Sequence, residues 1–115
     1  MPAQNISLLT LTVALAGTVT ANRFVIPAGT QAGADASTLG VCRVSGVSGD
    51  NAPVDVLGTA VVEAGAAISK GASLKSDASG RAITWASSGA KVGIALEAAT
   101  AAGQMIEVLL IPNVA

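Results

Sequence analysis

Apolar side chains alternate with small or polar ones near the start of the chain. Leu9, Leu11, Val13 and Leu15 occupy alternate positions, and threonine or alanine fills positions 10, 12, 14 and 16 between them. A period of two places the four apolar side chains on one face of an extended strand, whereas a helix would scatter them around its axis. The segment therefore predicts a β-strand with one apolar face.

The rest of the chain consists of short apolar or β-branched runs that end at glycine, proline or small polar residues. Such runs predict strands at 18–26, 38–44, 54–62, 91–97 and 104–111. Gly58 lies inside one run, where it predicts a β-bulge. The pattern predicts an all-β fold: a small β-sandwich or barrel-like domain of short strands and hairpins, with an extended N-terminal strand or arm and little helix.

One hairpin is predicted in detail, over residues 72–84. Its turn is Asp77-Ala-Ser-Gly80, in which the glycine can adopt a positive φ. The alanine-rich segments 60–67 and 95–102 favour helix, but glycines interrupt or flank both, so we expect at most one short helix.

The N-terminal segment raises the question of a signal peptide or a membrane span, because residues 1–22 carry no charged side chain. A secretory signal begins with basic residues, and the first basic residue here is Arg23. The threonines in the segment also argue against a spanning helix. We expect no membrane contact, and we divide the chain into an N-terminal strand or arm (1–17) and a single β domain (18–115).

Composition excludes most catalytic chemistry. The chain has no His and one Cys, so it cannot form a Ser-His-Asp centre, a common zinc site or an internal disulfide. Its 7 acidic residues are scattered, and we expect each of them to lie on a solvated turn or strand face. Cys42 is expected to be a small buried hydrophobe. The sequence therefore predicts no enzyme, no metal site and no cofactor, and its 6 dispersed basic residues predict no nucleic-acid surface.

The apolar fraction of 51% overstates the core, because 24 residues are alanine and only one Phe and one Trp are present. A large aliphatic side chain contributes about 1.5–3 kcal/mol when it is buried, and alanine contributes far less. We expect a thin core that is completed by neighbours, either copies of the chain or a larger assembly. The alternative is a modestly stable monomer.

Two segments of the second half carry a resemblance to a known family. They are VVEAGAAISKGASLKSDASGRAI at 61–83 and VGIALEAATAAGQMIEVLLI at 92–111, and TLGVCRV at 38–44 fits an earlier strand of the same pattern. From about residue 20 to about residue 112, the chain resembles the capsid decoration, or cement, proteins of tailed bacteriophages. That family has no catalytic residues to carry over.

The resemblance implies a structural virion protein that is made in the host cytoplasm and located on the outer capsid surface. It implies binding where major capsid subunits of the HK97-like fold meet, as a homotrimer or, alternatively, a dimer. Such a protein would hold neighbouring capsomers together against the internal pressure of the packaged DNA.

The candidate contact residues for the capsid or a neighbouring subunit are Ile6, Leu8, Leu9, Leu11, Val13 and Trp85. The strand around the first five could pair by β-augmentation with a capsid strand or a neighbouring copy. It could equally be an ordinary strand of the domain's own sheet. Trp85 could anchor a partner or fill the core.

Two alternative functions stay open from the residues alone. A lipoyl or biotinyl carrier barrel has short strands and glycine spacing like that of 65–71, but it needs a lysine at an exposed hairpin tip, and Lys75 lies before the turn. A subunit of another self-assembling protein coat is the other alternative.

Overall fold

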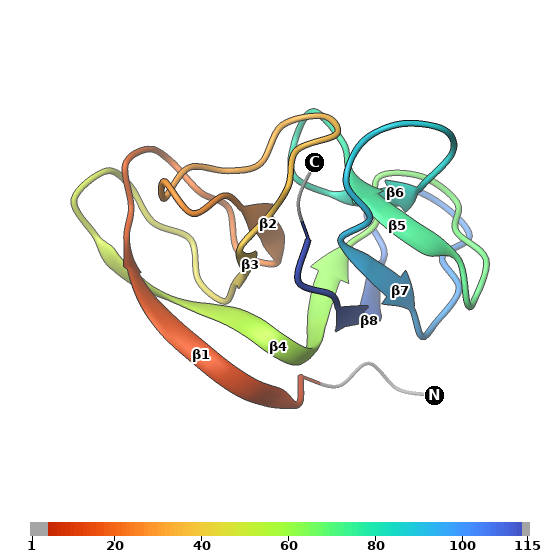
Figure 1. Ribbon diagram of the computed structural model, residues 1–115, viewed down its shortest axis with the longest axis horizontal. Coiled ribbons are helices and arrows are strands. Elements are labelled where there is room, and N and C mark those ends of the chain that lie inside the picture. Colours follow the sequence, from red (N-terminus) through yellow and green to blue (C-terminus); the bar gives the residue numbers. More distant parts are fainter. Residues whose placement is uncertain (1–4, 114–115) are drawn as a thin grey trace.

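The computed structural model describes residues 5–113 and contains no helix in that range. Its eight strands form one sheet (Figure 1). They are β1 (Ser7–Ala14), β2 (Arg23–Val25), β3 (Gly40–Cys42), β4 (Asn51–Glu63), β5 (Ser73–Ser76), β6 (Ala82–Thr84), β7 (Gly93–Ala95) and β8 (Met105–Leu110). The all-β prediction is confirmed, and within the described range no helix is long and apolar enough to span a membrane.

The sheet is nearly closed into a barrel. The strand order is β2-β3-β4-β8-β7-β5-β6, and β1 pairs with β4 off this path. The two ends of the path meet, because the N–H of Phe24 in β2 donates to the carbonyl of Gly80 just before β6, at 2.8 Å. A nearly closed sheet leaves few unpaired strand edges.

β4 is the longest strand and joins the two halves of the molecule. Its first half pairs with β1 on one side and β3 on the other, and its second half pairs with β8. The predicted bulge is confirmed: Gly58 has a φ of 97°, and the register between β1 and β4 shifts beside it. The pairing of β1 with β4 is antiparallel and within one chain.

The described residues form two core clusters. Adjacent residues in β2 and β3 enter different clusters: Phe24 and Val41 belong to the larger one, and Val25 and Cys42 to the smaller one. Both faces of β2 and β3 are therefore buried. The sequence could not predict this, because both faces of such strands carry apolar residues and no alternation distinguishes them. Cys42 is a buried free thiol, as expected.

Three predicted strands are much shorter than their apolar runs, and the run at 91–97 yields only β7. The run at 18–26 yields only β2, because Asn22 adopts a φ of 63° and forms a turn just before it. The run at 38–44 yields only β3. The hairpin is confirmed: Asp77 Oδ1 accepts the N–H groups of Ser79 and Arg81 at 2.8 and 2.9 Å, and Gly80 has a φ of 75°.

Candidate functional site

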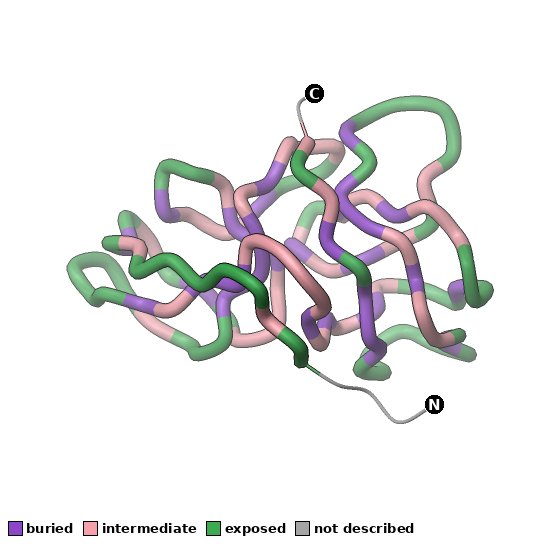
Figure 2. Tube along the Cα trace, turned by 60° about the horizontal axis from the view of Figure 1, so that its bottom comes forward, coloured by how far each residue is buried: buried purple, intermediate pink, exposed green. Residues whose placement is uncertain are grey.

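β1 presents large apolar side chains to solvent. Leu8 is 78% exposed and Ile6, just before the strand, is 55% exposed, while Leu9 and Leu11 are also exposed. Val13 is half-buried against the smaller core cluster. Figure 2 shows that β1 is exposed along most of its length. The predicted apolar face exists, but only its end near Val13 is packed.

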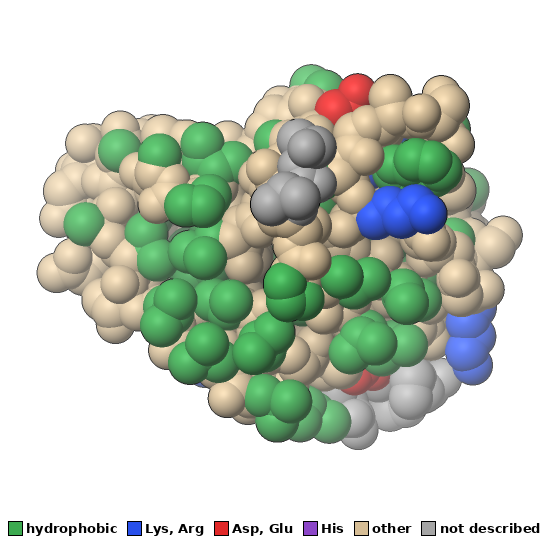
Figure 3. Space-filling view, viewed as in Figure 1, with side chains coloured by type: hydrophobic (Ala, Val, Ile, Leu, Met, Phe, Trp, Pro, Cys, Tyr) green, Lys and Arg blue, Asp and Glu red, His purple; other side chains and the backbone are tan. Residues whose placement is uncertain are grey.

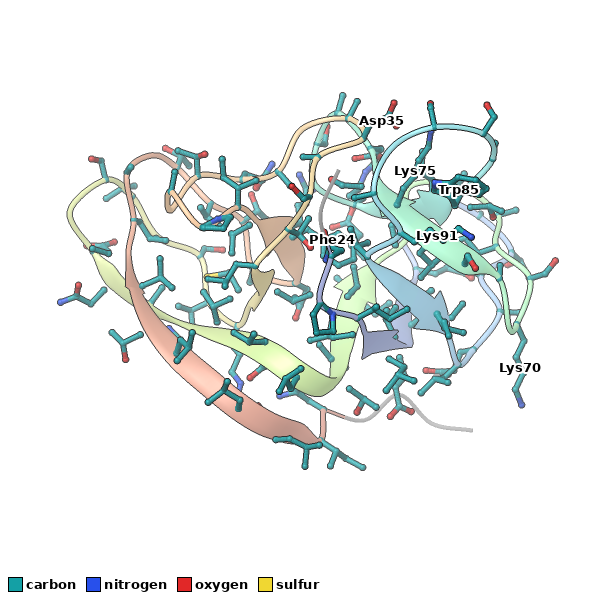
Figure 4. All side chains as sticks on the ribbon, viewed as in Figure 1. Phe24, Asp35, Lys70, Lys75, Trp85 and Lys91 are labelled. Atoms are coloured by element: carbon teal, nitrogen blue, oxygen red, sulfur yellow. The ribbon has the colours of Figure 1, made fainter. Side chains whose placement is uncertain are left out.

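This strand belongs to a wider apolar surface. On the face in Figure 3, hydrophobic side chains form a band that runs over β1 and continues over β8 and β7. Leu109 of β8 is exposed. Lys70 and Lys91, labelled in Figure 4, lie toward the other end of the molecule from β1, and Lys91 is close to the part of the band over β7. An extended apolar band along β1 is the kind of surface that binds another protein.

The second edge of β1 has no partner strand among the described residues. At its end, Gly29 lies against the Ala14 carbonyl and accepts a hydrogen bond from the N–H of Ala16 at 3.0 Å. The N–H of Leu15 donates to the carbonyl of Asp50 at 2.8 Å. Because bonded positions alternate in an antiparallel pair, Val13 and Leu11 also face β4 with their N–H and C=O groups, and the positions between them do not. Pro53 lies opposite Thr12. Proline has no N–H, and it is tolerated here because this pair exchanges no hydrogen bonds between β1 and β4.

The outward positions on this edge are Thr10, Thr12 and Ala14. All three are exposed, and β4 is the strand that β1 pairs with in the described part of the chain. The N–H and C=O groups of Thr10 and Thr12 can therefore receive an additional strand, whereas the Ala14 carbonyl already lies against Gly29. The sequence predicted the strand, but its register with β4 was needed to find which positions face outward.

A buried carboxylate fastens β1 to the sheet. Asp55 of β4 is buried, and both of its carboxylate oxygens accept hydrogen bonds from Arg43 Nε at 2.9 Å. Thr10 Oγ1 donates to Asp55 Oδ1 at 2.9 Å, and Ser7 Oγ lies 2.7 Å from Thr10 Oγ1. The expectation that every acid lies on a solvated face was wrong for Asp55 and for the buried Glu107. In both cases the sequence offered one indication of burial, because each of these acids lies within an apolar run.

The environment of Asp55 favours its charged form. Burial by itself would raise the pKa of Asp55, but hydrogen bonds from Arg43 and Thr10, a contact with the Ser7 hydroxyl and the charge of Arg43 outweigh burial and hold the pKa below its ordinary value. A pocket of about 240 Å³ lies beside this group, lined by Asn5, Asn22, Val41, Arg43, Asp55 and Val61. Among the described residues no group of three potential ligands could hold a metal ion.

Acid sensitivity of the fold follows from this carboxylate. A group whose pKa is lower in the folded state contributes stability above its unfolded pKa of about 3.9, and that contribution is lost as the pH falls through the folded pKa. Replacing Asp55 with asparagine is expected to cost about 2 kcal/mol of unfolding free energy at pH 7 and less below pH ~3. Urea unfolding at both pH values measures the difference.

The control for this experiment is Asp50→Asn, because Asp50 is exposed and is bonded to the backbone N–H of Val47. That variant should differ little from the parent protein at either pH. A cost for Asp55→Asn that stays constant between pH 7 and pH ~3 would contradict the role given to the Asp55 charge.

Trp85 lies apart from the other candidates. It is half-buried and belongs to neither core cluster, so the core-filling interpretation was wrong. Its Nε1 donates to the carbonyl of Gly89 at 2.9 Å, and Lys91 Nζ lies 4.4 Å from the ring centroid. Figure 4 places Trp85 on the far side of the molecule from β1. One partner surface of ordinary size would therefore not cover both sites.

Lys75 does not have the position that a carrier barrel requires. It lies inside β5, its side chain is mostly buried, and its Nζ is 2.8 Å from Asp35 Oδ1. A lysine that receives a lipoyl or biotinyl group must project from a hairpin tip into solvent. The geometry of Lys75 disfavours that alternative.

Comparison with known proteins agrees with these features. A family model described as phage cement protein matches residues 3–110. Among solved structures, the chain is similar to the N base of head fiber gp8.5 of bacteriophage phi29, with 22% sequence identity, a TM-score of 0.73, and coverage of 93% of this chain and 97% of that one. No curated protein matches the sequence. The structural similarity supports the fold, and the match over nearly the whole sequence establishes the family: the chain belongs to the phage cement proteins.

Proposed function

We propose that this protein decorates an icosahedral phage head by binding its outer surface between subunits of an HK97-like major capsid protein. Family membership gives the chain a structural role at the phage capsid and a place in the virion. The proposal adds the outer surface, the position between capsid subunits, self-association into a homo-oligomer and synthesis in the host cytoplasm.

The observation that carries the proposal is the uncharged apolar surface of the N-terminal strand. Residues 1–22 contain no charged side chain, and Ile6 and Leu8 are both more than half exposed. Exposed large side chains that cluster without charges are stabilised when another protein covers them. We propose that residues 1–17 act as a binding arm. Residues 1–4 lie outside the described residues; β1 attaches the arm to β4, and Leu8 is the most exposed of its large apolar side chains in the described part.

The contact set in this proposal combines the arm with a separate anchor. The arm contributes Ile6, Leu8, Leu9, Leu11 and Val13, and Trp85 on the other side of the molecule would contact a different neighbour. Contacts on two sides suit a protein that bridges capsid subunits. Repetition over a symmetric shell would then convert modest affinities into durable attachment.

Binding to undecorated heads tests this function. Replacing Leu8 with aspartate is expected to weaken binding by about tenfold or more, because burial of a leucine contributes roughly 1.5–3 kcal/mol and the new carboxylate would have to be desolvated. Occupancy can be measured by cosedimentation of the purified protein with heads, and the lattice positions by electron microscopy.

Val47→Asp is the matched control. Val47 is also exposed, at 55%, but lies in the loop between β3 and β4 rather than on β1. This variant should occupy heads as the parent protein does. Full occupancy by Leu8→Asp would show that the arm is not the capsid contact, and failure of the unmodified protein to bind heads would refute the proposed function itself.

A further inference from the structure

We propose that Glu107 of β8 receives a lysine or arginine side chain of the capsid protein when the apolar band is covered. The inference rests on the proposed function, because the partner is the same, and it adds the chemistry of one contact. Binding of the unmodified protein to heads tests the function, whereas a comparison of variants on those heads tests this inference. The two can therefore fail separately.

Glu107 lies on the outward face of β8. The even-numbered residues of this strand belong to the larger core cluster: Ile106, Val108 and Leu110. Side chains alternate between the two faces of a strand, so Glu107 shares the other face with Met105 and Leu109. These two neighbours are 46% and 39% exposed, yet Glu107 is only 2% exposed. The carboxylate is therefore enclosed within the apolar band and not within the core.

The carboxylate of Glu107 has an unused hydrogen-bonding capacity. Its Oε1 is buried and accepts no hydrogen bond. In the range 5–113 the other buried side-chain nitrogen or oxygen without a partner is Nε of Arg23, but that guanidinium still contacts Glu63, with Nη2 3.3 Å from Oε1. Buried polar groups are nearly always hydrogen-bonded, and a buried carboxylate without a donor is unfavourable. The single chain leaves this acceptor unsatisfied.

The described bases of the chain do not pair with Glu107. The acids that form ion pairs in the described range are Asp35, Asp55, Glu63 and Asp77. Outside those pairs, Lys91 Nζ lies over the ring of Trp85, and Lys70 points away from the molecule in Figure 4. A second acid lies beside Glu107, because Glu97 Oε1 accepts the Glu107 N–H at 2.8 Å. Charge complementarity therefore favours a basic group from another protein.

The apolar surroundings favour a basic side chain over a metal ion. Lysine and arginine combine an apolar stem with a charged end. The stem could lie against Met105 and Leu109, which an approaching side chain meets first, while the charged end reaches Glu107. Calcium needs about six to eight oxygen ligands. No group of three potential protein ligands for a metal exists in the part of the chain that the structure describes.

Glu107→Gln tests the inference on undecorated heads. Glutamine has the same length but no negative charge, so the basic group of the capsid protein would be buried without a counter-ion. We expect this variant to bind heads about tenfold or more weakly than the parent protein, as measured by cosedimentation. Equal affinities of the two proteins would overturn the inference.

Asp50→Asn is the matched control for the loss of one negative charge. Asp50 is exposed and lies in the loop between β3 and β4, outside β8. This variant should bind heads with the affinity of the parent protein. A tenfold loss in this control as well would show that the total charge of the protein, and not Glu107, governs binding, which would also overturn the inference.

The stability of the isolated protein distinguishes a binding role from a structural one. Methionine is similar in length to glutamate and has no polar atom to leave unpaired. Glu107→Met should therefore unfold at a higher urea concentration than the parent protein, although it binds heads more weakly. A lower urea midpoint would contradict the inference, because it would mean that the chain itself already compensates the carboxylate.

Chemical modification of the heads identifies the basic group. Acetylation removes the charge of lysine, and phenylglyoxal modifies arginine. On heads in which the partner of Glu107 is modified, the parent protein and Glu107→Gln should bind equally, because both lack the contact. A difference that persists on both kinds of modified heads would overturn the inference. If EDTA abolishes the difference on unmodified heads and calcium restores it, Glu107 binds a metal ion and the inference is wrong.

Discussion

Replacing Phe24 with alanine is expected to lower the free energy of unfolding by about 4 kcal/mol, a large part of the roughly 5–15 kcal/mol that stabilises a typical domain. Phe24 is fully buried in the larger core cluster and is the one phenylalanine of the chain. Many of its cluster neighbours are alanines, which have no side-chain freedom to fill the cavity. Urea unfolding followed by circular dichroism measures the loss.

Phe24→Leu is the control for this experiment. Leucine keeps most of the buried apolar volume, so we expect a cost of about 1–2 kcal/mol. Equal costs for the leucine and alanine variants would show that the volume of the ring does not stabilise this core. A cost below ~1 kcal/mol for alanine would contradict the thin-core account altogether.

The second large effect is expected for Gly58→Ala, which should detach the beginning of β1. Gly58 has a φ of 97°, and a Cβ atom there would lie 2.2 Å from the carbonyl oxygen of Ile6 and 2.9 Å from the backbone nitrogen of Leu8. Neither backbone atom can move unless β1 shifts. We expect a cost of roughly 3 kcal/mol, from the strained φ and the displaced strand together.

Hydrogen exchange at Thr59 reports this detachment directly, because its N–H donates to the carbonyl of Ile6 at 2.9 Å. The matched control is Gly71→Ala, since Gly71 has a similar φ of 88° but nothing within 4 Å of an added Cβ. It should cost only about 1–2 kcal/mol and leave exchange at Thr59 unchanged. If Gly58→Ala has the same small cost and leaves exchange at Thr59 unchanged, the close approach of β1 to β4 is not the reason why position 58 requires glycine.

Local features of the fold could be predicted from the sequence because their causes are local. Alternation of apolar and polar residues around Leu11 predicted a strand, and the turn residues Asp77 and Gly80 predicted a hairpin. A glycine inside an apolar run predicted the bulge at Gly58. In each case a few consecutive residues determine the backbone conformation.

The pairing of strands could not be predicted in the same way. Val62 of β4 lies opposite Ile106 of β8, and this pairing depends on how the whole sheet closes. Nothing in the runs themselves selects one apolar strand over another as the partner. Similarly, the burial of both faces of β3 follows from its place between two core clusters rather than from its three residues.

The candidate surface was predictable only in part. The exposed apolar residues of β1 were identified because they share one strand, whereas the grouping with Trp85 had no basis in the sequence pattern and the two are far apart. Asp55 was missed because its burial depends on Arg43 and Thr10, which approach it from two other segments of the chain. Such convergence becomes visible only in three dimensions.

The buried position of Cys42 makes the protein convenient for site-specific chemistry. Cys42 is the one cysteine of the chain, it is fully buried, and its thiol donates to the carbonyl of Val44 at 3.0 Å. A maleimide dye would therefore react with a cysteine introduced at an exposed site and spare the native thiol. A fluorophore placed in this way can follow single molecules without first removing the natural cysteine.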